Sequence, residues 1–130
     1  MAGMVLTLTL ALHVVDEATH DFLGFYNPFV MMLRDVLLIQ WLPTFEFTEW
    51  LAGLAIAVAV LLALSRVALA GARWIEWLSF PYGVLMLGNG LVHIVGSLYF
   101  QRMLPGVLSA PLLVAASIWL FIRTRAALRR

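Results

Sequence analysis

The stretch WLAGLAIAVAVLLALS, residues 50–65, contains no charged side chain and ends against Arg66. A helix that crosses the hydrocarbon core of a bilayer needs about 20 largely apolar residues. With its flanks included, this stretch reaches that length. We therefore predict a membrane-spanning helix over about 46–68.

The composition of the whole chain supports this interpretation. Of its 130 residues, 64% are apolar and only 12% are charged, and the mean hydropathy is +1.01. A soluble domain is typically about 45–50% apolar and about 25% charged, and one of this size has too much surface to bury so many apolar side chains. These values exclude a soluble domain, a disordered tail and a fibrous repeat. A net charge of +1 without a basic stripe gives no basis for a nucleic-acid partner, and the absence of Cys excludes disulfides and thiolate metal sites.

Three further runs are poor in charge. Residues 1–15 and 103–122 carry no charge, and residues 77–101 carry only His93 among basic and acidic side chains. The first run is short, so it must include the polar residues 16–22 to cross a bilayer, and we expect it to be a retained first span rather than a cleaved signal. None of the runs alternates as barrel strands do. We predict one all-helical domain over 1–130, a four-helix transmembrane bundle. Its spans are about 1–22, 46–68, 75–100 and 104–124.

The segment 28–43 differs from the four spans. It holds Pro28, Arg34, Asp35 and Pro43 among large apolar residues. We predict a short interfacial helix that lies along the lipid headgroups between the first two spans. An ordinary packed loop is the alternative.

The arginines predict the orientation of the bundle. With four spans, both termini lie on one side of the membrane, and positively charged loops favour the cytoplasm. The side with the termini would carry six arginines, and the opposite side would carry Arg34 and Arg102. We therefore predict that both termini are cytoplasmic. The six are Arg66, Arg73, Arg123, Arg125, Arg129 and Arg130.

Ionisable side chains are concentrated in the first span. Such groups cost at least about 2.5–3.5 kcal/mol each in the centre of a bilayer, so they mark candidate functional sites. At 100° per residue, His13, Asp16, Glu17 and His20 lie on one helix face, and Asp21 lies at its margin. Imidazole and carboxylate groups at i, i+3 and i, i+4 can hold one cation, because they cover the same patch of the helix.

Two other spans bring polar side chains to the same depth. With a rise of 1.5 Å per residue, His13 and His20 lie roughly 18 and 28 Å from one membrane face, and Asn89 and His93 roughly 20 and 26 Å. Counted back from Arg66, Glu49 and Glu46 lie roughly 26 and 30 Å up. As an alternative, the two glutamates suit a helix start, where their negative charge interacts favourably with the helix dipole. Asn89 could instead form a hydrogen bond between helices.

The pattern predicts a metal site. Neutral imidazole and carboxylate suit a divalent transition metal such as zinc or iron, and three ligands with one open position are typical of a catalytic site. Asp16 and Glu17 are the expected catalytic carboxylates, and Asp16 or Glu49 would move a proton. Supporting side chains or alternative ligands are Asn89, Glu46, Glu49 and Asp21. The expected ligands are His13, Glu17, His20 and His93.

The segment His13-Val14-Val15-Asp16-Glu17 resembles the signature of the HXXEE family of small bacterial integral membrane proteins, with Asp16 in place of the first Glu. The resemblance covers most of the chain. It implies a multi-helix fold in a bacterial inner membrane and a polar site built from His13, Asp16, Glu17, Asn89 and His93, but no activity. A second block continues the resemblance, except that Met103 stands near the position where the family would have a Tyr before the Pro-Gly pair. Its residues are Asn89, His93, Ser97, Arg102, Pro105-Gly106 and Ser109-Ala110-Pro111.

Three functions fit these residues. The first is a metal-binding membrane protein, with enzymatic action on a lipid-soluble substrate as the expected use of the metal. The second is metal-free acid–base catalysis by His and Glu, as in small four-helix isomerases. The third is a proton- or ion-handling accessory subunit, which would need a homo-oligomer or a larger membrane complex. Membrane lipid is an expected partner in each case.

Overall fold

The computed structural model describes residues 1–72 and 74–128, and this part of the chain is helical and contains no strand. Its five helices are α1 (Ala2–Thr19), α2 (Phe22–Leu37), α3 (Phe47–Leu69), α4 (Trp74–Tyr99) and α5 (Ala110–Leu128). Four helices, all except α2, are long and apolar enough to cross a membrane, which indicates a membrane protein. Three of the arginines predicted to be cytoplasmic lie outside the described residues: Arg73, Arg129 and Arg130.

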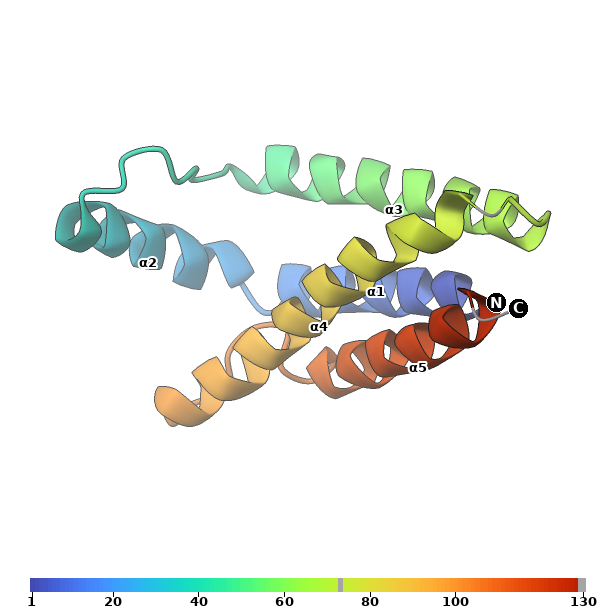
Figure 1. Ribbon diagram of the computed structural model, residues 1–130. Helices are drawn as coiled ribbons and strands as arrows, with labels where there is room; N and C mark the ends of the chain where they lie inside the picture. Colours follow the sequence, from blue (N-terminus) through green and yellow to red (C-terminus); the bar gives the residue numbers. More distant parts are fainter. Residues whose placement is uncertain (73, 129–130) are drawn as a thin grey trace.

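Helix α1 is the centre of the bundle. It packs against α3 and α5, and α5 in turn packs against α4. Helix α1 begins, and α5 ends, at the same end of the bundle (Figure 1), as four spans require. Leu6 of α1 and Leu113 of α5 are fully buried in the core between them.

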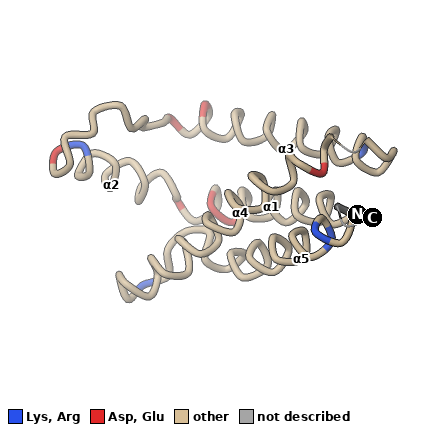
Figure 2. Tube along the Cα trace, in the orientation of Figure 1, with Lys and Arg blue, Asp and Glu red and all other residues tan. Residues whose placement is uncertain are grey.

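Helix α3 is the least covered of the four long helices. Only Trp50 and Ser65 of this helix are buried, while Ile56, Val60 and other large apolar side chains are exposed. The middle of α3 carries no charge (Figure 2). An exposed apolar surface of this kind is unfavourable in water and suits contact with lipid.

The first span ends earlier than the predicted bound of residue 22. Helix α1 stops at Thr19, and the His20 Nδ1 lies 2.8 Å from the Asp16 carbonyl oxygen, which the helix end leaves free. Asp21 adopts a left-handed conformation (φ 54°), which Asp tolerates better than most residues, and its side chain caps α2 by accepting from the Gly24 N–H.

The segment predicted to lie at the interface, 28–43, contains the second half of α2 and the loop that follows it. Helix α2 starts at Phe22 and projects beyond the end of α1 rather than folding back over the bundle (Figure 1). Its tip is held by Arg34, whose guanidinium donates to the Leu42 carbonyl oxygen.

The last span begins later than predicted. Residues 104–109 form a turn instead of the first turns of a helix, and α5 starts at Ala110. Gly106 has a φ of +85°, in the left-handed region that glycine adopts readily and that a helix cannot contain. This turn brings backbone atoms against α1 and α4, where the polar side chains gather.

Candidate metal centre

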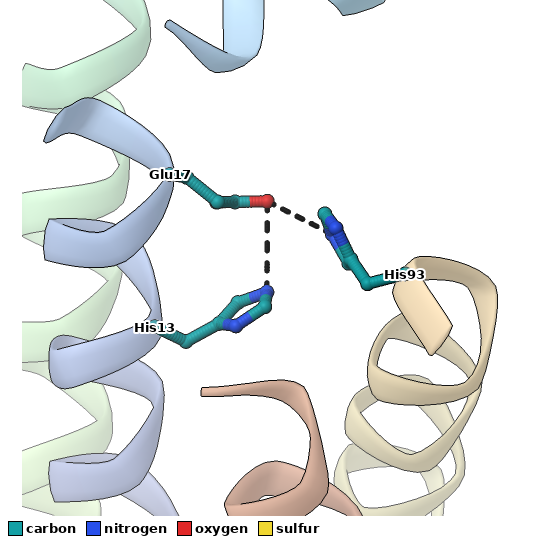
Figure 3. Close-up of side chains that lie close together, drawn as sticks. All are labelled: His13, Glu17 and His93. Carbon is teal, nitrogen blue, oxygen red and sulfur yellow. Dashed lines mark ion pairs between the residues drawn. The ribbon is translucent and has the colours of Figure 1, made fainter. Parts of the chain in front are cut away.

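Two helices bring three ionisable side chains together inside the bundle. His13 and Glu17 lie one turn apart on α1, and His93 faces them from α4 (Figure 3). The Glu17 Oε1 lies 3.6 Å from the His13 Nε2 and 3.0 Å from the His93 Nε2. The two imidazoles meet edge to face, with their centroids 4.8 Å apart. All three side chains are buried.

The hydrogen bonds of His93 fix which of its nitrogens carries the proton. Its Nδ1 lies 2.6 Å from the Pro105 carbonyl oxygen. A carbonyl oxygen only accepts, so the Nδ1 must donate. In the neutral ring, the Nε2 then presents a lone pair toward Glu17.

Ser109 fixes the position of the proton on the His13 ring in the same way. The Ser109 hydroxyl donates to the Asp16 Oδ2 at 2.7 Å, and its oxygen lies 2.8 Å from the His13 Nδ1. Because the single hydroxyl proton is used on the carboxylate, the Ser109 oxygen accepts from the His13 Nδ1. The neutral His13 ring therefore also presents a lone pair from its Nε2, which is buried and makes no hydrogen bond within the described residues.

Three acceptor atoms thus face one another in a buried space. Without a donor or a cation between them, the unsatisfied His13 Nε2 alone would lower the stability of the folded protein by about 1–3 kcal/mol. Two ligands that each lie about 2.0–2.1 Å from a tetrahedral metal ion are roughly 3.4 Å apart. The separations of 3.0 and 3.6 Å at Glu17 lie on either side of this value, and all three ligand atoms lie within 4.8 Å of one another. Nδ1 donation to a carbonyl or another acceptor is the usual support of a metal-bound histidine.

Asp16 supports this cluster and does not join it. Its Oδ2 accepts from both the backbone N–H and the hydroxyl of Ser109, at 2.9 and 2.7 Å. Its Oδ1 faces His20, whose Nδ1 lies 3.0 Å away. His20 itself is a residue of the helix end with a side chain 53% exposed, so it lies outside the group that could hold one ion.

Of the other residues predicted near the site, three lie elsewhere and Asn89 lies close to Glu17. Glu46 and Glu49 are exposed at the start of α3, and Asp21 is exposed and caps α2. Asn89 is half-buried and lies on a cleft that Glu17 also lines.

The sequence interpretation assigned no role in the site to the turn between α4 and α5. Pro105 supplies the acceptor for His93, and Ser109 links His13 to Asp16. Two features of the sequence could have indicated this role: the Pro105-Gly106 pair, which is typical of a turn, and Ser109, which lies three residues after Gly106.

Phe22 packs beside the cluster. Its ring lies 5.9 Å from the His93 ring and 5.6 Å from the Trp50 ring, centroid to centroid. The first residue of α2 therefore connects the site to α3.

We expect Gly106→Ala to destabilise the protein by about 1–3 kcal/mol. The residue has a left-handed φ, and an added Cβ would lie 2.8 Å from the His93 Nδ1 and 2.9 Å from the His13 Cε1. Thermal unfolding in detergent measures this. Gly53→Ala is the matched control, because a Cβ there meets nothing within 4 Å, and it should unfold at or above the wild-type temperature. Equal unfolding temperatures for the wild type and Gly106→Ala would contradict the packing described.

Comparisons with family models, curated proteins and solved structures found no match for this chain.

Proposed function

We propose that the protein is an integral membrane protein that binds one divalent transition metal ion, zinc or iron, between His13, Glu17 and His93, and that it acts on a lipid-soluble substrate. The observation that carries this proposal is the convergence of three buried acceptor atoms, with both imidazole Nδ1 positions already used as donors. Two histidines and one carboxylate are a common ligand set of catalytic zinc and of non-haem iron.

The residues around the ion have separable roles in this proposal. A bound ion would polarise a substrate oxygen or activate water. The Pro105 carbonyl and the Ser109 hydroxyl hold the two rings with their Nε2 atoms toward Glu17. Asp16 holds Ser109, and it reaches the exposed His20, so a proton can pass between the outer surface and Asp16.

The test is the metal content of the full chain, purified in detergent without chelator from cells supplied with zinc, iron and manganese. We expect about one ion per chain in the wild type and in His20→Ala, and a large loss in His93→Ala. His20→Ala is the matched control, because the same side chain is removed outside the cluster. A wild-type protein free of transition metal would overturn the proposal.

The 3.0 Å separation between His93 and Glu17 also favours a second candidate, metal-free acid–base catalysis. A His93 ring protonated on both nitrogens would donate to Glu17 and to the Pro105 carbonyl oxygen together. A metal-free wild type that turns over an apolar substrate, and loses this activity in the double variant His13→Ala with Glu17→Gln, would support this candidate instead.

We also propose that both termini are cytoplasmic in a bacterial inner membrane, and that the chain is a member of the HXXEE family. The excess of arginine on the side of the termini supports the orientation. The likeness of the segment 13–17 to the family signature supports the family assignment.

The orientation can be tested directly, because the chain has no cysteine. Ala70 and Gln40 are both exposed, and they lie in the connections at opposite ends of α3. We expect a membrane-impermeant maleimide to label Gln40→Cys in cells with a permeabilised outer membrane, and to label Ala70→Cys only after the inner membrane is also opened. The reverse pattern would show that the termini face outward.

A further inference from the structure

An apolar cleft adjoins the candidate metal centre. Helices α3 and α4 lie close together where α3 ends and α4 begins, and they separate toward the other end of the bundle (Figure 1). Between them and α1 lies a cleft of about 610 Å³, within the usual range for small-molecule sites of about 300–1,000 Å³. Leu10, Leu54, Ala57 and Leu85 are among its apolar lining residues.

The lining of the cleft favours a hydrocarbon chain. Each of the three helices lines it over about two turns, roughly 10 Å along the bundle, and most of the lining side chains are apolar. A second, smaller cavity of about 100 Å³ shares Leu61 and Tyr82 with it and is also lined by Met1. The two spaces together extend the apolar lining toward the N-terminus, which suits a hydrocarbon chain that lies along the bundle.

Two polar groups of the cleft lie together at one of its ends. Glu17 and Asn89 line the end away from the termini, and Glu17 is the same residue that contacts both histidines. The Asn89 amide has two N–H donors for a ligand oxygen. The Tyr82 hydroxyl, farther along the cleft, is already paired with Thr7 at 3.1 Å. An oxygen carried at one end of a hydrocarbon chain would thus meet Asn89 and the metal centre together.

We propose that this cleft binds a lipid with a single hydrocarbon chain and one uncharged oxygen group, an alcohol or an aldehyde, at the end that meets Glu17 and Asn89. The inference rests on the proposed function, because it names the substrate class of that site. An apolar pocket with a few placed polar groups is the usual form of such a site.

The test uses the full chain in phosphatidylcholine nanodiscs and a ten-carbon alcohol that carries a photoreactive diazirine in its chain. We expect cross-links to residues of the cleft, competed at least fivefold by excess decanol but not by decane. Ala57→Phe fills the cleft from α3 and should reduce the cross-links at least fivefold. Ala59→Phe is the matched control, since Ala59 is exposed on the same helix and does not line the cleft. Asn89→Leu should remove the preference for decanol over decane.

Metal content is measured on the same samples, which separates the two proposals. Competed cross-links in a protein without metal would support the cleft and overturn the metal centre. A protein with metal whose cross-links spread over exposed α3 without competition would overturn the cleft alone. Equal loss in Ala57→Phe and Ala59→Phe, or equal competition by decanol and decane, would also overturn it.

Discussion

Glu17→Gln is expected to weaken zinc or iron binding by more than about 100-fold. The variant keeps the size of the side chain but removes the negative charge of the carboxylate that lies 3.0 and 3.6 Å from the two histidine Nε2 atoms. Loss of a supporting partner around a metal typically costs about 10–100-fold in affinity, and loss of a ligand costs more. Equilibrium dialysis of the purified chain against buffered zinc measures the change.

Glu49→Gln is the matched control for this prediction. Glu49 is an exposed glutamate at the start of α3, so the same substitution there should leave the affinity unchanged. Equal zinc affinities of Glu17→Gln and the wild type would remove Glu17 from the ligand set. A loss in both variants would place the bound zinc at the surface.

Asp16→Ala is expected to lower the free energy of unfolding by about 3 kcal/mol or more, because each hydrogen bond to a charged group contributes about 1.5–3 kcal/mol. Asp16 is buried and accepts two hydrogen bonds from Ser109, and these bonds join α1 to the turn before α5. The effect should persist with a chelator present, since it does not depend on a metal. Unfolding in a mild detergent, followed by circular dichroism, measures it.

Two variants show whether this loss arises from the bonds to Ser109. Asp16→Asn keeps one acceptor oxygen and should fall between the wild type and Asp16→Ala. His20→Ala removes the exposed partner of Asp16 and should change stability by less than about 1 kcal/mol. If His20→Ala were as destabilising as Asp16→Ala, the partner that matters would be His20.

The long helices could be predicted from the sequence because charge marks their ends. Helices α3 and α4 lie within one residue of the expected bounds 46–68 and 75–100. The turn at 104–109 could not be found in this way. Val107 and Leu108 keep the local hydropathy high, while the feature that prevents a helix there is the backbone conformation of Gly106.

The candidate site could be predicted in part. His13 and Glu17 share one helix face, and the rise per residue puts His93 at the same depth, so the sequence predicted that the three lie near one another. The structure places them together. That they bind a metal stays a prediction. His20 was also expected on this face. Helix α1 ends at Thr19, however, so the helical spacing no longer applies to His20. Depth along α3 predicted Glu46 and Glu49 at the level of the site, but both side chains are exposed, and depth does not determine the direction in which a side chain points.

The link between His13 and Ser109, 96 residues apart, also has a consequence for biogenesis. Helix α1 leaves the ribosome before the turn at 104–109, so its imidazoles and carboxylates emerge while that turn is still unsynthesised. Until then, His13 and Asp16 lack the partner that Ser109 gives them. The centre can therefore take its final form only after the segment that carries Ser109 has been made.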